Sequence, residues 1–137
     1  MGKYLDAVHE RVVVFDGAMG TSIQDRNLTA DDFGGPQFEG CNEILNVTRP
    51  DVIADIHRGF LEAGVDVVET NAFGAFSTVL IEYGIAERAY ELSRAAADIA
   101  REVADSYDGD RWVAGNLGPG TKLPSLGQIR FGRMPRH

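Results

Sequence analysis

Residues 65–71 have the sequence Val65-Asp66-Val67-Val68-Glu69-Thr70-Asn71, a short apolar run that ends in three polar residues. Such a run is typical of a strand in a parallel sheet, because both faces of that sheet are covered. Two further stretches show the same pattern: Val12-Val13-Val14-Phe15-Asp16-Gly17 and Trp112-Val113-Ala114-Gly115-Asn116-Leu117-Gly118. In parallel α/β proteins, ligands bind at the carboxyl ends of strands, so we expect the three polar tips to outline one site.

Helical patterns separate these predicted strands. A first helix is expected over 48–64, with Thr48 or Arg49 as its cap, since apolar residues recur along one face. A second is expected over 77–103, with an interruption near Gly84. Strands that alternate with helices predict an α/β protein in which crossovers join parallel strands.

Two further segments complete the predicted order. Residues 3–10 favour a short helix that leads into the first strand at 11–15, and 17–46 lack a sustained period and are expected to form a long loop. The tips at Asp16 and Glu69 are 53 residues apart (69 − 16), more than the roughly 30 residues of a plain βαβ unit. The surplus follows the strand ends, where barrel enzymes place their active-site loops.

The composition indicates a protein with its own core and excludes several classes of partner. At 137 residues, of which 44% are hydrophobic and 25% charged, the chain suffices for one globular domain. Its 13 Lys and Arg against 21 Asp and Glu give a formal charge of -8, which disfavours nucleic acid. No apolar run approaches the roughly 20 residues that span a bilayer, so we expect no membrane partner and a cytoplasmic location.

The polar tips supply the candidate site residues. Asp16-Gly17-Ala18 is a turn whose amides could hold a substrate carboxylate while Asp16 accepts from an amine; the alternative is a turn that simply ends the strand. Glu69-Thr70-Asn71 brings a carboxylate to the second tip, and the alternative is a carboxylate satisfied by backbone amides or an arginine. For Asn116, loop shaping is the favoured interpretation.

Neither the single cysteine nor the central histidine predicts a catalytic or metal site. Cys41, in the long loop, has no second cysteine for a disulfide or a Cys-rich metal site, and spacing pairs no histidine with it. His57 lies in the first long helix and is expected at a helix flank rather than as a ligand. We therefore predict no catalytic and no metal-binding residue in this chain.

Five motifs occur in order along the chain: Val14-Phe15-Asp16-Gly17-Ala18-Met19-Gly20-Thr21, Glu39-Gly40-Cys41-Asn42-Glu43-Ile44-Leu45-Asn46, Thr48-Arg49-Pro50-Asp51, Val68-Glu69-Thr70-Asn71-Ala72-Phe73-Gly74-Ala75 and Gly118-Pro119-Gly120-Thr121-Lys122-Leu123-Pro124. Together they resemble the start of the homocysteine-binding domain of the cobalamin-dependent methionine synthases. No single motif decides the match, but the ordered set is specific.

The resemblance implies the N-terminal portion, about three βα units, of a (β/α)8 TIM barrel whose strand tips bind homocysteine. It also implies zinc and methylcobalamin: zinc holds the substrate sulfur as a thiolate, and methylcobalamin supplies the methyl group that gives methionine. By motif position, the substrate-binding residues would be Asp16, Gly17 and Ala18 at the amino-acid end of homocysteine, with Glu69, Thr70, Asn71 and Asn116 around the same mouth.

The chain departs from the family pattern at three places. Ala18 stands where many members have a second glycine, and Ala72 stands where the family often has a threonine. The family takes three zinc-binding cysteines from later strands, and Cys41 matches none of them. The resemblance therefore implies that the zinc ligands are absent from this chain.

We accordingly expect a partial homocysteine-binding domain over 1–137, a fragment in which 11–129 match the family and 130–137 form an atypical tail. Its partners would be homocysteine, the remaining barrel, and the folate and cobalamin domains of the full-length enzyme. The isolated chain is expected to be an inactive piece of a methyltransferase. Two alternatives stay open: a zinc-dependent homocysteine methyltransferase with another methyl donor, or a non-catalytic α/β binding module.

Overall fold

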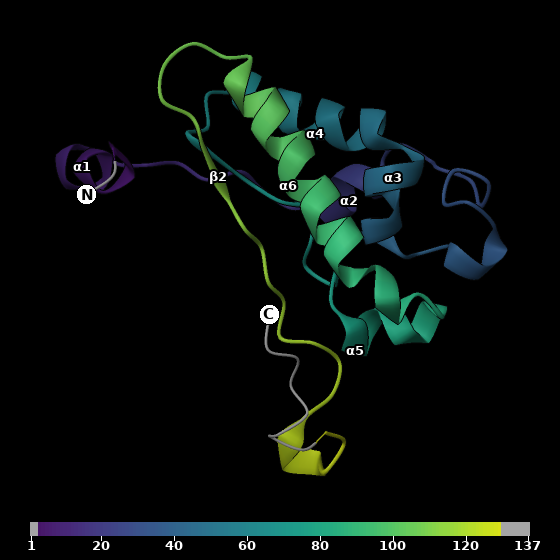
Figure 1. The fold of residues 1–137 in the computed structure, drawn as a ribbon. Helices are drawn as coiled ribbons and strands as arrows, with labels where there is room; N and C mark the ends of the chain where they lie inside the picture. Colours follow the sequence, from purple (N-terminus) through teal and green to yellow (C-terminus); the bar gives the residue numbers. More distant parts are fainter. Residues whose placement is uncertain (1–2, 130–137) are drawn as a thin grey trace.

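A computed structural model describes residues 3–129 and shows a small parallel sheet packed against helices (Figure 1). Strand β1, Val67–Glu69, pairs in parallel with β2, Trp112–Ala114, with Val68 opposite Val113. Earlier in the chain, Phe15 forms an isolated parallel bridge to Val67. Three parallel segments therefore lie side by side in chain order, which confirms the predicted α/β arrangement.

The helices also follow the predicted alternation. The α-helices of the described residues are α1 (Lys3–Glu10), α2 (Met19–Gln24), α3 (Leu45–Thr48), α4 (Pro50–Glu62), α5 (Ser77–Leu80) and α6 (Ala89–Asp105). Single turns of 3₁₀ helix lie at Pro36–Phe38, Asn42–Ile44, Ile81–Tyr83, Ala86–Arg88 and Pro124–Leu126.

The first predicted strand, 11–15, is wrong in extent and in burial. Only Phe15 of this segment forms a bridge, and Val12 is 82% exposed. The segment is held from one side, where the amide of Val67 donates to Val14 O at 3.1 Å. Because β1 is its one neighbouring strand among residues 3–129, its apolar side chains stay open to solvent instead of being buried on both faces.

Helix α4 confirms the first predicted helix and corrects its capping. Pro50 occupies the first turn, and Asp51 complements the positive end of the helix dipole. Arg49 stands at the cap position, but no side-chain hydrogen bond caps the helix, and Thr48 Oγ1 instead donates to Ile44 O at 3.2 Å. Of the two residues predicted to cap the helix, Arg49 therefore occupies the cap position through its backbone, and Thr48 does not.

His57 is buried in the core, so its predicted position at a helix flank is wrong. The residue is 0% exposed and lies on the α4 face that also buries Ile53 and Leu61. Burial lowers the pKa of its imidazole to about 4, and neither ring nitrogen has a partner within residues 3–129. The spacing of four residues on either side places His57 inside the apolar stripe.

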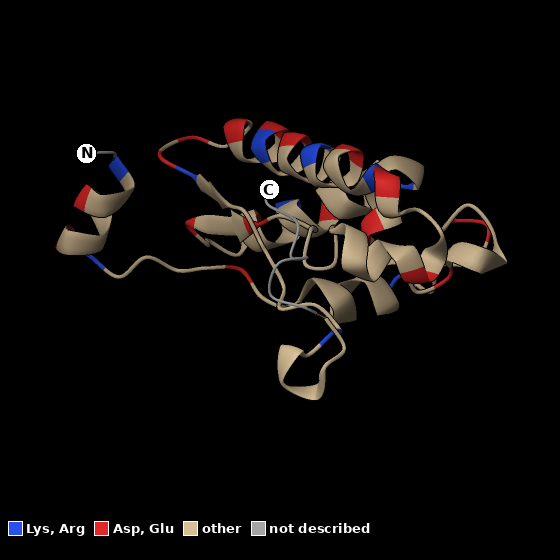
Figure 2. Ribbon diagram, turned by 60° about the horizontal axis from the view of Figure 1, so that its bottom comes forward, with Lys and Arg blue, Asp and Glu red and all other residues tan. Residues whose placement is uncertain are grey.

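Helix α6 forms the long amphipathic helix expected after Gly84. Gly84 has a φ of 70°, in the left-handed region that glycine adopts without strain, and it ends the preceding 3₁₀ turn. Leu92 and Val103 are buried on the inner side of α6. Figure 2 shows acidic and basic residues alternating along the outer side, where Arg101 pairs with Asp105 at 2.8 Å.

The predicted long loop, 17–46, contains more structure than the sequence indicates. Helix α2 and two 3₁₀ turns lie within it, and Ile23, Phe33 and Leu45 are buried in the core. Isolated turns bury single apolar residues without any repeat, and a search for periodicity does not detect them. The prediction of a long loop is therefore wrong for the helical parts of this segment.

Two apolar clusters hold the sheet and helices together. The larger joins 17–46 to α3, α4 and the first half of α6, and it includes Ile53 and Leu92. The smaller includes Val68 of β1 and Val103 near the end of α6. Helix α4 packs against β1, and α6 packs against both strands.

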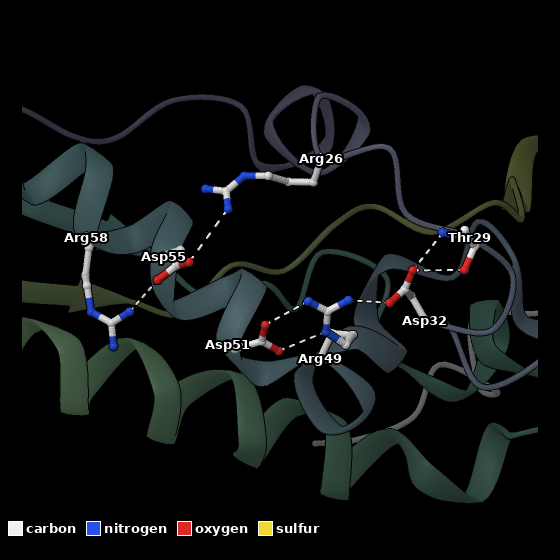
Figure 3. A network of polar contacts seen from close by, with 7 residues as sticks. All are labelled: Arg26, Thr29, Asp32, Arg49, Asp51, Asp55 and Arg58. Atoms are coloured by element: carbon white, nitrogen blue, oxygen red, sulfur yellow. Dashed lines mark hydrogen bonds and ion pairs between the residues drawn. The ribbon is translucent and has the colours of Figure 1, made fainter.

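A network of ion pairs ties the start of α4 to the loop before it (Figure 3). Arg49 donates twice to Asp51, at 3.0 and 2.8 Å, and forms an ion pair with Asp32. Asp32 also accepts from the amide and the hydroxyl of Thr29, at 2.8 and 3.0 Å. Such surface pairs contribute at most about 1 kcal/mol each, so the network orients the loop more than it stabilises the fold. The remaining residues drawn are Arg26, Asp55 and Arg58.

The atypical tail predicted at 130–137 lies outside the described residues. Residues 115–129 follow β2 with a single 3₁₀ turn, and Leu117 within them is 72% exposed. Among residues 3–129, no helix has the length and apolar character needed to cross a membrane.

Candidate functional site

The three strand tips lie next to one another because their strands are parallel neighbours. At each step across the sheet, a side chain at one tip accepts a hydrogen bond from the backbone of the next. Asp16 Oδ2 accepts from the amide of Glu69 at 3.0 Å, and Thr70 Oγ1 accepts from the amide of Asn116 at 2.9 Å. These side chains extend the pairing of the strands and fix the tips relative to one another.

Asp16 has a carboxyl oxygen that the fold leaves without a partner. Its Oδ1 atom is buried and accepts no hydrogen bond from residues 3–129. Burial is the largest cause that raises the pKa of Asp16 to about 6; the bond from the Glu69 amide opposes it, and the Glu69 charge adds to it. A buried oxygen that lacks a donor favours a ligand that brings one.

Gly17 and Ala18 form the turn that follows Asp16. A Cβ atom on Gly17 would lie 3.3 Å from the ring of Phe60, so the turn packs closely against α4. Ala18 directly precedes α2, and its carbonyl accepts from Ser22 Oγ at 3.0 Å. These contacts fix the turn beside the Asp16 carboxyl group.

The side chains of the adjacent residues Glu69 and Thr70 lie in different environments. Glu69 is half-buried, and its negative charge raises the pKa of Asp16. Thr70 and Asn116 line a cavity of about 470 Å³ whose other walls include α6 and Leu117, and neither Asp16 nor Glu69 lines it. The structure thus brings these predicted residues together as two pairs rather than in one pocket.

Asn71 joins neither pair, because its side chain is directed into the fold. Its Nδ2 atom donates to Asn42 O at 2.9 Å and to Asn46 Oδ1 at 3.0 Å. In return, Asn46 Nδ2 donates to Asn71 O at 2.9 Å and to Leu92 O at 3.3 Å. Both asparagines are buried, so Asn71 holds the strand tip from behind.

Sequence reasoning gives no individual role to three residues near this tip, namely Asn42, Glu43 and Asn46. Glu43 Oε1 accepts from the amide of Gly74 at 2.8 Å, and the two asparagines bind Asn71. The feature of the sequence that points to such a role is Asn46 itself, because an asparagine within an apolar stretch needs buried hydrogen-bond partners.

The described residues do not fit a zinc site. Cys41 is 1% exposed, and burial raises the pKa of its thiol to about 11, which disfavours the thiolate that a metal requires. Its Sγ atom lies 3.9 Å from Glu43 Oε2. Between residues 3 and 129, no group of three or more His, Cys, Asp or Glu side chains is placed to hold a metal ion. No step through zinc follows from these residues.

The fold and the tips define a class: a parallel α/β protein with its candidate ligand groups at the carboxyl ends of the strands. A family model described as homocysteine S-methyltransferase matches residues 13–135. The chain belongs to the homocysteine S-methyltransferase family, which confirms the resemblance inferred from its motifs.

Curated relatives include two methionine synthases. That of Mycobacterium tuberculosis is 55% identical to this chain and that of Mycobacterium leprae 53% identical, each over 130 residues. The match covers 93% of this chain and 11% of each relative. The chain therefore spans only a small part of the length of these relatives.

Two solved structures of the homocysteine methyltransferase MmuM from Escherichia coli have a similar fold. The oxidised form matches with a TM-score of 0.70 and the metallated form with 0.68, both at 22% sequence identity. Each match covers 85% of this chain and 41% of the other. At this level of identity, the likeness shows a shared fold.

Proposed function

We propose that this chain forms the part of a homocysteine S-methyltransferase site that holds the amino-acid end of homocysteine. One observation carries the proposal: Asp16 Oδ1 is buried without a donor from residues 3–129, while Oδ2 is held by the amide of Glu69. The ammonium group of an amino acid supplies a donor and a positive charge, and a charge-assisted hydrogen bond to carboxylate is a strong one.

Glu69 supports the same role for Asp16. Its negative charge raises the pKa of Asp16, and a bound cation would reverse that effect by stabilising both carboxylates. We assign the turn amides at Gly17 and Ala18 to the substrate carboxylate, because this turn is fixed beside Asp16. Thr70, Asn71 and Asn116 complete the proposed set by holding the tips in place.

The finer fold prediction is that the three parallel segments are the first of eight strands in a (β/α)8 barrel. The parallel order and the likeness to MmuM support it. In this proposal the whole of 1–137 belongs to one homocysteine-binding domain, and the boundaries at 11–129 and 130–137 stay predictions.

Zinc and methylcobalamin enter the proposal as cofactors of the full-length family, and the folate and cobalamin domains enter as its remaining parts. The support is that the curated relatives are methionine synthases, of which this chain spans 11%. Zinc, when bound, supplies a Lewis acid at the substrate sulfur. The described residues lack its ligand set, so we assign them the other end of homocysteine. The cytoplasmic location stays a prediction.

Asp16→Asn is expected to weaken homocysteine binding about 10- to 100-fold, because the charge-assisted hydrogen bond to the ammonium group is lost. Calorimetric titration of the chain with L-homocysteine, without zinc, measures the change. Affinity for the unchanged chain should rise as the pH increases through about 6, where Asp16 loses its proton. Asp110→Asn is the matched control, because Asp110 pairs with Lys3 on the surface. Equal affinity of the Asp16 and control variants would refute the assignment.

The isolated chain is expected to form no methionine from homocysteine, zinc and methylcobalamin. The reason is that residues 3–129 provide no group of metal ligands to activate the substrate sulfur. Mass spectrometry of the reaction mixture measures methionine, with a full-length methionine synthase as the positive control. Turnover by the purified 137-residue chain would contradict this expectation.

A further inference from the structure

The stretch 39–46 is a motif to which the proposed function gives no role, although it lies directly behind the tip of β1. We propose that Asn42, Glu43 and Asn46 form a brace that positions 69–74, which makes Asn46 a positioning residue of the candidate site. The ligand in this inference rests on the proposed function, whereas the brace rests on contacts within the chain.

The first part of the brace is a reciprocal pair of amides. Asn46 Nδ2 donates to Asn71 O at 2.9 Å, and Asn71 Nδ2 donates to Asn46 Oδ1 at 3.0 Å. The second donor bond of Asn46 reaches Leu92 O on α6 at 3.3 Å. Two donors and one acceptor on one short side chain are what asparagine provides, and aspartate or leucine of similar size does not.

The second part of the brace holds the other end of the same loop. Glu43 Oε1 accepts from the amide of Gly74 at 2.8 Å. A Cβ atom on Gly74 would lie 2.9 Å from that same oxygen, so the glycine allows the carboxylate to approach the backbone. The brace therefore contacts the loop at Asn71 and again three residues later.

The brace holds the backbone that contributes to both pairs of site residues, Asp16 with Glu69 and Thr70 with Asn116. The amide of Glu69, two residues before Asn71, donates to Asp16, and the hydroxyl of Thr70 accepts from the amide of Asn116. A displacement of Asn71 would change the geometry of both bonds. Asn46 would thereby influence the Asp16 carboxyl group without contacting it.

The burial of the amide pair argues against a role in stability alone. Asn46 is 3% exposed and Asn71 5% exposed. Their bonds join the two side chains to each other and to the backbone carbonyls of Asn42, Asn71 and Leu92. Apolar packing has no direction, whereas these bonds do, so the amide pair adds a single defined arrangement of the loop.

Asn46→Leu is the main test, with Val103→Ala as the matched control. Val103 is 4% exposed in the smaller cluster and has no part in the brace. Amide hydrogen exchange measured by NMR should accelerate at least about tenfold at Glu69, Gly74 and Asn116 in the Asn46 variant. Loss of the Asn46 bonds loosens the backbone that holds these amides against their acceptors on Asp16, Glu43 and Thr70. The control should accelerate exchange near the end of α6 and leave these three amides unchanged.

The titration of Asp16 gives a second readout, one that general destabilisation does not move. Loosening the tip would weaken the bond from the Glu69 amide and admit water to the Asp16 carboxyl group. That bond lowers the pKa of Asp16 and burial raises it, so the pKa should move away from about 6 in Asn46→Leu. The carboxyl ¹³C shift against pH measures it. An unchanged Asp16 titration together with unchanged exchange at the three tip amides would overturn the brace.

Glu43→Ala and Glu43→Gln keep the inference testable if Asn46→Leu does not fold. Glu43 is only partly buried, and glutamine retains an acceptor for the amide of Gly74 whereas alanine does not. Exchange at Gly74 should accelerate in the alanine variant and return toward the original rate in the glutamine variant. Equal rates in both variants would overturn the brace.

Homocysteine titration separates this inference from the proposed function. If the unchanged chain binds homocysteine, Asn46→Leu should weaken binding at least about tenfold, and Val103→Ala should not. If the unchanged chain shows no binding, the proposed function fails, and hydrogen exchange still decides whether the brace exists. Binding that survives in Asn46→Leu while the tip amides exchange faster would overturn the positioning role.

Discussion

Asp66→Ala is expected to lower the free energy of unfolding by about 2 kcal/mol, because this carboxylate holds the segment before Asp16 against the sheet and its loss leaves the Val14 amide without an acceptor. Asp66 accepts from Arg11 at 2.9 and 2.8 Å and from the amide of Val14 at 2.8 Å. Arg11 is also the first cause that lowers the pKa of Asp66, to about 2. Urea unfolding followed by circular dichroism measures the change.

Asp66→Asn separates the charge from the hydrogen bonds. The asparagine oxygen can still accept from the amide of Val14, so an intermediate loss of stability is expected. Asp110→Ala removes an exposed ion pair with Lys3 and should change stability by less than about 1 kcal/mol. A loss of the same size in Asp66→Ala and Asp110→Ala would show that the Arg11 pair does not hold the segment.

Acidification from pH 7 to pH 4 is expected to remove about 3 kcal/mol of stability through His57 alone. The folded chain holds this imidazole neutral, with its pKa lowered from 6.5 to about 4 by burial. The unfolded chain therefore binds the proton first, and stability is lost as the pH falls from 6.5 toward 4. His57→Leu should flatten this part of the curve, as measured by urea unfolding at a series of pH values.

Two aspartates titrate near this range and have to be distinguished from His57. Asp16, with its pKa raised to about 6, acts in the opposite direction: the folded chain binds its proton first, so stability rises as the pH falls from 6 toward 3.8. Asp66, with its pKa lowered to about 2, loses its contribution only below 3.8. The Asp16→Asn background removes the opposing slope, and a pH dependence unchanged by His57→Leu in that background would exclude His57 as its source.

The parallel order could be predicted from sequence because three apolar runs alternate with helical patterns. Local patterns do not show how many neighbours a strand has, so they predict that 11–15 is buried, whereas Val12 is 82% exposed. The apolar stripe of α4 is equally clear, yet the polarity of His57 favours a position outside it. Burial depends on position in the stripe, and position prevailed over polarity at this residue.

The candidate site was predictable as far as its location at the strand tips. The positions of Asp16 and Glu69 after apolar runs predict that they lie at neighbouring tips, and the Asp16 carboxyl group contacts the Glu69 backbone. The contact between Asn46 and Asn71 joins residues 25 positions apart, and nothing in local spacing specifies such a pair. Roles that depend on long-range hydrogen bonds become visible only when the tertiary structure brings the partners together.

Labelling of Cys41 can measure how often the structure around it opens, because this residue is buried. Cys41 has the only thiol in the sequence, is 1% exposed and directly precedes the brace residues Asn42 and Glu43. A thiol reagent can reach it only when this part of the chain opens, so the labelling rate measures how often the opening occurs. A single-site chemical label therefore already stands beside the candidate site, and no engineered cysteine is needed to follow it.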